Sequence, residues 1–344
     1  MNFACSSKHL DYSTLGLTEH AITRGWSLYL DRGWSRIENY FYKGLRSSWC
    51  KIYVDPVLRI ETNRLRDFPI YYNKDTLSNF QKLDHAVPVD GVIELDNEIK
   101  VSYQKNFYPQ LAKNFLSTHE CHEILFDALI ENIGTFASTN NAEIYIPSQG
   151  GIDTLTIRSV FDHLNVEYKI FDMPTSPPDL SQLGSELAKK YWGFMQVQEK
   201  DNAVVVTGFY GDEWVLRNPY YAHVLLSRRN VDIVEEFDKV QNCYMKNYFE
   251  GYRKKCNNKA DMGINELMSQ ICNDFQIWHI HDTKFFSPLK HESLLHLLTA
   301  DTQTIIEQVT DAKLSKSIIE RCNPDLVKYI DVLKNQHDPD YFWT

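Results

Sequence analysis

The chain has no long apolar run. Of its 344 residues, 43% are hydrophobic, but no stretch approaches the roughly 18 apolar residues that a membrane-spanning helix requires. The first five residues, Met1 to Cys5, also lack the charged and then apolar pattern of a signal peptide. From these two absences we expect no membrane partner and a cytoplasmic location.

Closely paired cysteines are missing as well. The seven cysteines are odd in number and scattered, without any C-x-x-C pair. A disulfide framework or a structural zinc site requires closer, paired spacing. We therefore expect mostly reduced, buried or half-buried thiols at positions 5, 50, 121, 243, 256, 272 and 322.

Basic residues are in the minority. Lys and Arg number 36 against 46 Asp and Glu, which gives a formal net charge of −10. This balance disfavours a broad nucleic-acid-binding surface, although it leaves room for a local basic groove. Internal repeats and low-complexity tracts are also lacking. The length and the apolar content fit two ordinary domains, each with its own core.

The first hundred residues have the character of a β-rich domain. Short segments rich in aromatic and β-branched residues predict strands at 49–55, 67–72 and 91–95. Polar turns such as 73–75 and 96–98 separate them. We expect this domain to extend over residues 1–108.

From residue 109 to residue 344 the pattern changes to alternating strands and helices. Ser117 and Glu120 form a helix-capping signature, and helical spacing continues to Ile133. Apolar strands are predicted at 143–147, 167–171 and 203–207, with a helix through 155–164. From about 230 onward the pattern is mostly helical, including 264–274 and 294–309. This order predicts an α/β fold with a parallel sheet covered by helices and a helical C-terminal part.

A glycine turn follows the predicted strand at 143–147. It contains Ser148, Gln149, Gly150, Gly151, Ile152, Asp153 and Thr154. Such a turn before a helix presents backbone N–H groups to phosphate, and glycine allows the backbone to approach an anion closely. Thr154 can offer a hydroxyl, and Asp153 can hold a cation that bridges phosphate oxygens. A tight turn in which Asp153 and Thr154 act as local caps explains the segment equally well.

This turn resembles the S-G-G-x-D-S signature of the ATP-pyrophosphatase (PP-loop) superfamily, with Gln149 in place of the first serine. Residues 206–213 resemble the S-G-E-G-x-D-E segment of asparagine synthetases within that superfamily, with Phe209 and Tyr210 in place of a glutamate and a glycine. Residues 313–321 resemble the K-x-[IL]-[LI]-R-x segment near the end of the synthetase domain. Residues 287–289 precede it, where the family often has P-F/L-x-D. The resemblance implies an adenine nucleotide alpha hydrolase-like domain that binds ATP and Mg²⁺.

The resemblance also implies a set of site residues. ATP would be bound by Ser148, Gln149, Gly150, Gly151, Asp153, Thr154, Phe171 and Gly208. Asp153 and Asp212 would share the metal, since two acidic residues at one edge of a parallel sheet suit a metal-bridged pyrophosphate. Lys316, Asp212 and Glu213 would be catalytic, with the lysine neutralising charge that develops on the reacting group. The alternatives are helix capping by Asp212 and Glu213 and a solvated Lys316.

The resemblance reaches the β-rich domain. Residues 68–72 and 87–95 are similar to strands of the family's glutaminase domain, which implies a small Ntn-like fold. In the family, the glutaminase domain works through an N-terminal cysteine that is exposed when the initiator methionine is removed. In this chain the residue after the initiator methionine is Asn2. Cys5 is too far into the chain for an α-amino group to act as its base. We therefore expect that glutamine is not hydrolysed.

The activity implied is that of an ATP-dependent carbon–nitrogen ligase, which adenylates a small-molecule carboxylate, releases pyrophosphate and transfers the acyl group to ammonia or an amine. Because Phe209 replaces a glutamate that is common in asparagine-forming members, the identity of the acyl substrate stays open. Whether the chain forms a homodimer also stays open. Gln149, Phe209 and Tyr210 favour a second interpretation, a non-catalytic nucleotide-binding scaffold. A third, activation of a nucleic-acid base, is disfavoured by the acidic composition and the absence of paired cysteines.

Overall fold

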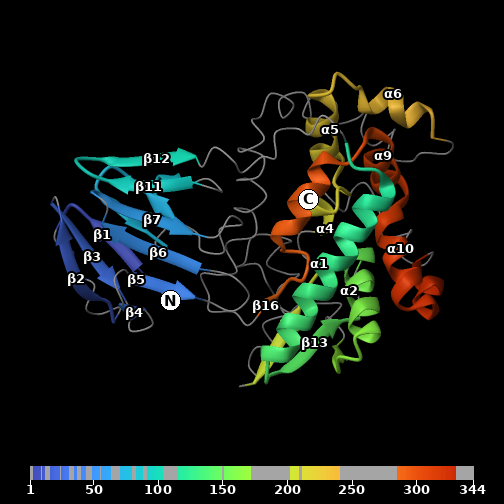
Figure 1. Cartoon of the computed structure of the whole chain (residues 1–344), viewed down its shortest axis with the longest axis horizontal. Helices are drawn as coiled ribbons and strands as arrows, with labels where there is room; N and C mark the ends of the chain where they lie inside the picture. The colour runs from blue at the N-terminus through green and yellow to red at the C-terminus, as the bar shows by residue number, and fades with distance from the viewer. Residues whose placement is uncertain are drawn as a thin grey trace, which may run out of the picture. The chain divides into compact units, whose positions relative to one another are not determined.

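The computed structural model describes residues 3–8, 10–11, 16–23, 25–30, 35–36, 40–43, 49–54, 56–62, 70–79, 83–87, 91–103, 115–148, 151–171, 202–208, 211–240 and 285–330. They belong to two compact units, one within 3–103 and the other within 115–330 (Figure 1). The chain is a mixed α/β protein with antiparallel sheets in the first unit and a small parallel sheet in the second. None of the helices in these ranges combines the length and the apolar character that crossing a membrane requires.

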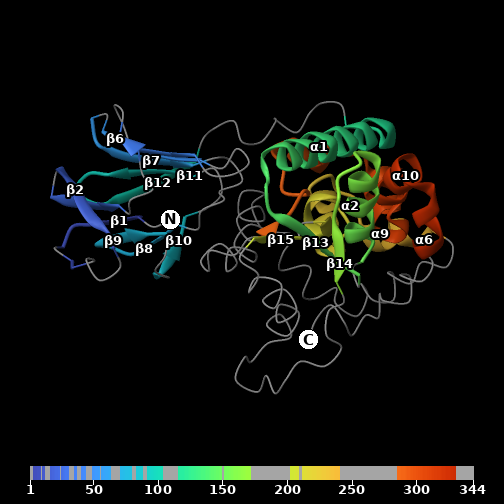
Figure 2. The ribbon, with the colours of Figure 1, turned by 90° about the horizontal axis from the view of Figure 1, so that it is seen from below.

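In its described part, the first unit contains two six-stranded antiparallel sheets, drawn as two layers in Figure 2. One has the order β10-β8-β9-β1-β3-β2, formed by β1 Phe3–Ser6, β2 Thr18–Thr23, β3 Trp26–Leu30, β8 Tyr71–Tyr72, β9 Thr76–Ser78 and β10 His85–Ala86. The other has the order β12-β11-β7-β6-β5-β4, formed by β4 Ser35–Arg36, β5 Tyr40–Lys43, β6 Trp49–Val54, β7 Leu58–Thr62, β11 Gly91–Leu95 and β12 Ile99–Tyr103. The predicted strands at 49–55 and 91–95 are confirmed as β6 and β11, and β8 is the described strand within 67–72.

Alternating burial creates the core of this unit. In β7, Leu58 and Ile60 are buried and Arg59 between them is half-buried, which is the pattern of a strand covered on one face. Buried residues of both sheets join in one cluster that includes Phe3, Cys5, Trp26, Ile52, Ile60 and Ile93. Strand β1 is buried on both faces, because its Ala4 packs with Leu17 and Tyr29.

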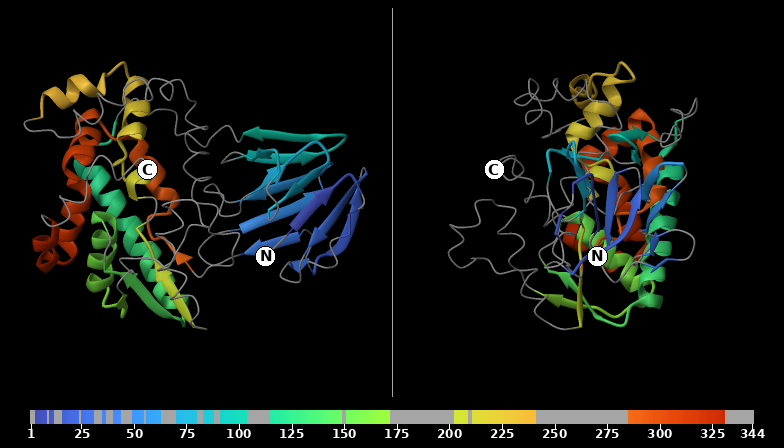
Figure 3. Two further views of the ribbon diagram at one scale, coloured as in Figure 1. Left: turned by 180° about the vertical axis from the view of Figure 1, so that it is seen from behind. Right: turned by 90° about the vertical axis from the view of Figure 1, so that its left-hand side faces the viewer.

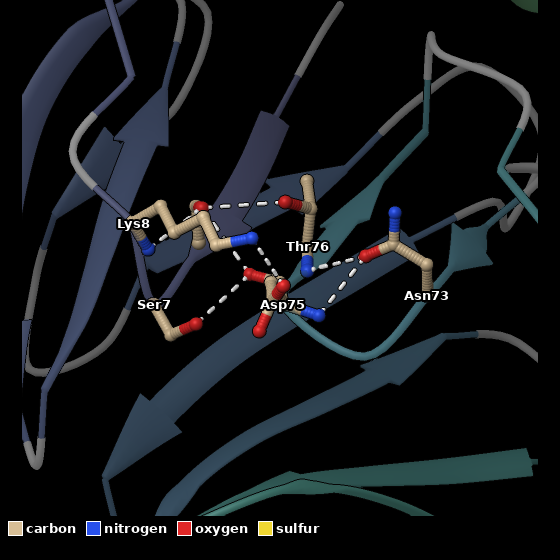
Figure 4. Close-up of polar contacts among 6 residues, drawn as sticks. Ser7, Lys8, Asn73, Asp75 and Thr76 are labelled. Atoms are coloured by element: carbon tan, nitrogen blue, oxygen red, sulfur yellow. Dashed lines mark hydrogen bonds and ion pairs between the residues drawn. The ribbon is translucent and has the colours of Figure 1, made fainter.

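A polar cluster fixes the end of β1 against the turn between β8 and β9 (Figure 4). The side-chain oxygen of Asn73 accepts hydrogen bonds from the backbone N–H groups of Asp75 and Thr76 at 3.0 and 2.8 Å, which closes the turn. Asp75 forms an ion pair of 2.5 Å with Lys8, and its carbonyl oxygen accepts the N–H of Ser7 at 2.9 Å. These bonds support the register in which β1 pairs with β9.

Within the described residues, the second unit has a four-stranded parallel sheet in the order β14-β13-β15-β16. Its strands are β13 Glu143–Pro147, β14 Lys169–Phe171, β15 Ala203–Val206 and β16 Phe285–Phe286. The parallel arrangement and the strands β13, β14 and β15 confirm the predictions. Strand β16 was not predicted, because two residues are too few to show a periodic pattern.

The helices of this unit in its described residues are α1 Thr118–Thr139, α2 Ile152–His163, α4 Gly211–Trp214, α5 Pro219–Ser227, α6 Ile233–Asp238, α9 Thr302–Asp311 and α10 Lys313–Cys322, with 3₁₀ segments η3 Glu292–Thr299 and η4 Pro324–Tyr329. The predicted capping box is confirmed, since Ser117 and Glu120 cap each other's backbone N–H at the start of α1. Figure 3 shows α1 and α2 in green beside α10 in red. Ile319 of α10 packs against Ile152 and Leu155 of α2.

The helical pattern expected at 294–309 is present as two segments, with a break between them that the pattern did not predict. η3 ends at Thr299, Ala300 forms a parallel bridge with Leu116, and α9 begins after Asp301, whose side chain accepts the N–H of Thr304. Both segments bury Leu or Ile residues, so the helical spacing continues across the break and does not reveal it. The helix predicted at 264–274 lies outside the described residues.

Candidate functional site

The first loop of the candidate site connects β13 to α2. After Pro147, the backbone N–H of Ser148 donates to the carbonyl of Phe171 at 2.8 Å, which ties the end of β13 to the end of β14. Gly151 is the N-cap of α2, and no side chain caps this helix start. Gln149 and Gly150 lie outside the described residues, while Ser148 and Phe171 are half-buried. The predicted strand and helix are therefore present on either side of the glycine loop.

The second loop connects β15 to the short helix α4. The N–H of Thr207 donates to the carbonyl of Phe286 at 2.8 Å, and the N–H of Gly211 donates to the carbonyl of Gly208 at 3.2 Å. Strand β15 pairs in parallel with β13, so both loops leave the sheet at the same edge. This edge, at the carboxyl ends of the strands, is where open α/β sheets usually bind ligands.

Two glycines allow the loops to touch. A Cβ on Gly208 would lie 2.9 Å from the backbone N of Thr154 and 3.0 Å from its Oγ1. A Cβ on Gly211 would lie 2.2 Å from Cγ of Asp153, so any side chain at Gly211 would force Asp153 to move. The absence of side chains at these two positions therefore allows the start of α2 and the second loop to pack directly together.

The charged centre of the site is an ion pair that the sequence pattern does not predict. Nη1 of Arg217 lies 2.5 Å from Oδ2 of Asp153, and Nη2 lies 3.5 Å from Oδ1 of Asp212. The side chains of Arg217 and Asp153 are 7% and 13% exposed, compared with 32% for Asp212. The two carboxylates predicted to share a metal thus face one guanidinium group. Arg217 lies in no phosphate-binding motif. The one signal in the sequence that could have indicated it is that a basic residue stands five positions after Asp212.

The surroundings of Asp153 perturb its ionisation. Burial raises the pKa of the Asp153 carboxyl to about 6; Arg217 acts in the opposite direction, and the negative charge of Asp212 raises the pKa again. Burial dominates because a carboxylate loses its hydration inside the protein. The neighbouring hydroxyls are also buried, with Thr154 and Thr207 at 7% and 2% exposed. The Thr207 hydroxyl has no hydrogen-bond partner within the described part of the chain.

Glu213 and Lys316 are the other two residues predicted to be catalytic. Glu213 is in α4, and its side chain lies outside the described part. Nζ of Lys316 forms an ion pair with Asp311. Lys316 lies one turn before Ile319, which packs on α2, so both residues face the same side of α10. The structure brings together Asp153, Thr154, Gly208 and Asp212, and it records no contact between Lys316 and this group.

The donor set can be compared with the needs of Mg²⁺. No group of three or more His, Cys, Asp or Glu side chains in the described ranges is arranged to hold a metal ion. Mg²⁺ is commonly bound through one or two carboxylates, with phosphate oxygens and water completing its shell. Asp153 and Asp212 therefore fit Mg²⁺ bound together with a phosphate, provided that Arg217 moves aside.

No protein-family model matches the chain, and no curated protein matches it at a significant level.

Proposed function

We propose that the chain is an ATP-dependent carbon–nitrogen ligase, with a PP-loop domain similar to that of asparagine synthetases. It adenylates a carboxylate, releases pyrophosphate and transfers the acyl group to ammonia or an amine. The observation that carries this proposal is the convergence of two loops at one edge of the parallel sheet, with Gly208 and Gly211 in direct contact with Thr154 and Asp153.

In the first proposed step, a carboxylate oxygen of the substrate attacks the α-phosphorus of ATP and pyrophosphate leaves. In the second, the nitrogen nucleophile attacks the acyl carbon, AMP leaves and the nitrogen loses a proton to solvent. Both steps depend on positioning and on stabilisation of negative charge more than on covalent catalysis by the protein. The chemistry therefore fits a site built from backbone N–H groups, hydroxyls and charged side chains.

Each residue has a proposed role. The start of α2, with Ser148, Gly151 and Thr154, binds the phosphates through backbone N–H and hydroxyl groups. Asp153 and Asp212 hold Mg²⁺, which supplies positive charge to the pyrophosphate when bound. Gln149, Gly150, Phe171 and Gly208 complete the nucleotide site, and Glu213 and Lys316 act on the reacting groups.

The proposal is tested by measuring pyrophosphate release in the presence of ATP, Mg²⁺, ammonia and a panel of carboxylic acids. We expect Asp153→Asn to lower turnover by about 10²- to 10³-fold, because it removes a preorganised charge at the site. Asp162→Asn is the matched control on the same helix. Its carboxylate accepts hydrogen bonds from Tyr168 at 2.8 Å and Asn323 at 2.6 Å, away from the loops. Equal turnover in both variants would overturn the site assignment.

The same assay separates the ligase from the scaffold. The ion pair of Arg217 with Asp153 and Asp212 favours a scaffold, because it neutralises the carboxylates without a metal. Tight ATP binding with no pyrophosphate release for any acid would therefore identify a non-catalytic protein. A loss of less than about threefold in Lys316→Ala, which is under 1 kcal/mol, would remove that lysine from the mechanism.

A further inference from the structure

Arg217 lies where the two candidate metal ligands converge. Its Nη1 lies 2.5 Å from Asp153 and its Nη2 lies 3.5 Å from Asp212, so each carboxylate forms an ion pair with a different nitrogen. A planar guanidinium can bind two anions in this way, whereas a lysine ammonium is a single point charge. With its side chain 7% exposed, Arg217 is the buried positive charge that balances this acidic pair.

The turn that carries Arg217 is held in a specific geometry. The N–H groups of Arg217 and Asn218 both donate to the carbonyl of Asp212, at 2.9 and 2.7 Å. Leu216, which is fully buried, has a φ of +61°. A bulky residue adopts this left-handed conformation only where the surrounding fold imposes it. The fold therefore positions Arg217 beside the two carboxylates, although the backbone at Leu216 is strained as a result.

We propose that Arg217 is a resident counter-ion that competes with a divalent cation for Asp153 and Asp212. The inference rests on the proposed function, which places a metal at these carboxylates. The guanidinium lies between two like charges that would otherwise repel each other. A divalent cation can bind both carboxylates only when the guanidinium has left them, because two cations at one point repel as well. Arg217 is thus a positioning residue that limits metal binding.

The size of the effect follows from how often the carboxylates are free. If Arg217 leaves them for about a tenth of the time, the apparent metal affinity falls about tenfold. Removing the guanidinium should restore that affinity. We therefore expect full-length Arg217→Gln to bind Mn²⁺ at least about tenfold more tightly than the wild type, in the absence of nucleotide.

The measurement is a Mn²⁺ titration followed by the electron paramagnetic resonance signal of the free ion. Arg321→Gln is the matched control, because Arg321 forms an ion pair of 2.7 Å with Glu123 and the variant loses the same charge elsewhere. It should bind Mn²⁺ as the wild type does. The double variant Arg217→Gln, Asp153→Asn should lose the gained affinity. No nucleotide is present, so the result does not depend on whether the protein turns over ATP.

A folded Arg217→Gln protein whose Mn²⁺ affinity stays within about threefold of the wild type would overturn the proposal. If this variant does not fold in a thermal melt, Arg217→Lys keeps the charge and replaces the fork by a single ammonium. Because lysine binds only one carboxylate well, we expect an intermediate gain in Mn²⁺ affinity. Wild-type affinity in Arg217→Lys would then count against the inference.

Discussion

At the residue scale, Gly211 serves packing as much as backbone freedom. Sequence reasoning assigns loop glycines to the close approach of a phosphate. The structure adds a local cause, because any Cβ on Gly211 would overlap the carboxyl group of Asp153. The conformation of Asp153, and with it the ion pair to Arg217, therefore depends on a residue that carries no functional group.

We expect Gly211→Ala to destabilise the protein by about 1–3 kcal/mol, the usual cost of inserting a methyl group into packed surroundings. Gly134→Ala provides a control of opposite sign. Gly134 lies inside α1, and a Cβ there meets no atom within 4 Å. Alanine should stabilise this helix by about 0.5–1 kcal/mol. Urea denaturation of both variants checks the prediction, and equal effects would contradict the packing argument.

At the element scale, helix α1 shows how local sequence fixes a boundary. Its capping box satisfies backbone N–H groups that the first turn of a helix leaves without partners. The helix then buries one face, including Leu125, Leu129 and Ile133. Its start is thus encoded by Ser117 and Glu120, whereas its packing depends on the rest of the unit.

We expect Ser117→Ala to cost about 1 kcal/mol of unfolding free energy, because it removes the N-cap. Ser138→Ala is the comparison in the last turn of the same helix. The hydroxyl of Ser138 is exposed and donates to the carbonyl of Thr135 at 2.9 Å. Since alanine is the better helix former, this change should be neutral or slightly stabilising. Thermal melts that rank the two variants in the reverse order would be inconsistent with the cap.

At the scale of the whole molecule, the first unit keeps Cys5 away from solvent. Cys5 is fully buried in the central strand β1, paired with Leu28 and Leu77. Burial raises the pKa of its thiol far above the usual range, so almost no nucleophilic thiolate forms at neutral pH. The buried thiol of Cys5 is therefore a poor nucleophile toward glutamine, and the ligase that we propose would use free ammonia or an amine.

We expect iodoacetamide to label Cys322 faster than Cys5 in the native protein. Cys322 is half-buried, and burial raises the pKa of its thiol to about 11, a smaller increase than that of Cys5. Peptide mass mapping measures both rates, and labelling in urea should remove the difference. Because the Cys5 thiol is buried, we also expect no release of glutamate when the protein is incubated with glutamine. Rapid labelling of native Cys5, or steady glutamate release, would contradict this prediction.

Local patterns were sufficient for part of the fold. Continuous apolar runs predicted the strands at 143–147 and 203–207, and helical spacing predicted α2 between them, because each pattern reflects which faces of an element are buried. The cap at Ser117 needed only four residues of sequence. The break at Ala300 was missed, because it arises from a bridge to Leu116, which is distant in the chain.

The sequence by itself determined that a glycine turn with Asp153 follows a buried strand, and that a second acidic residue, Asp212, follows another. Both facts depend on residue type and local order, so the chain encodes them directly. Only the tertiary structure decided that Arg217 lies between these carboxylates and that Gly211 touches Asp153. The contacts of Arg217 and Gly211 with Asp153 join residues more than fifty positions apart, and which such residues meet depends on how whole elements pack.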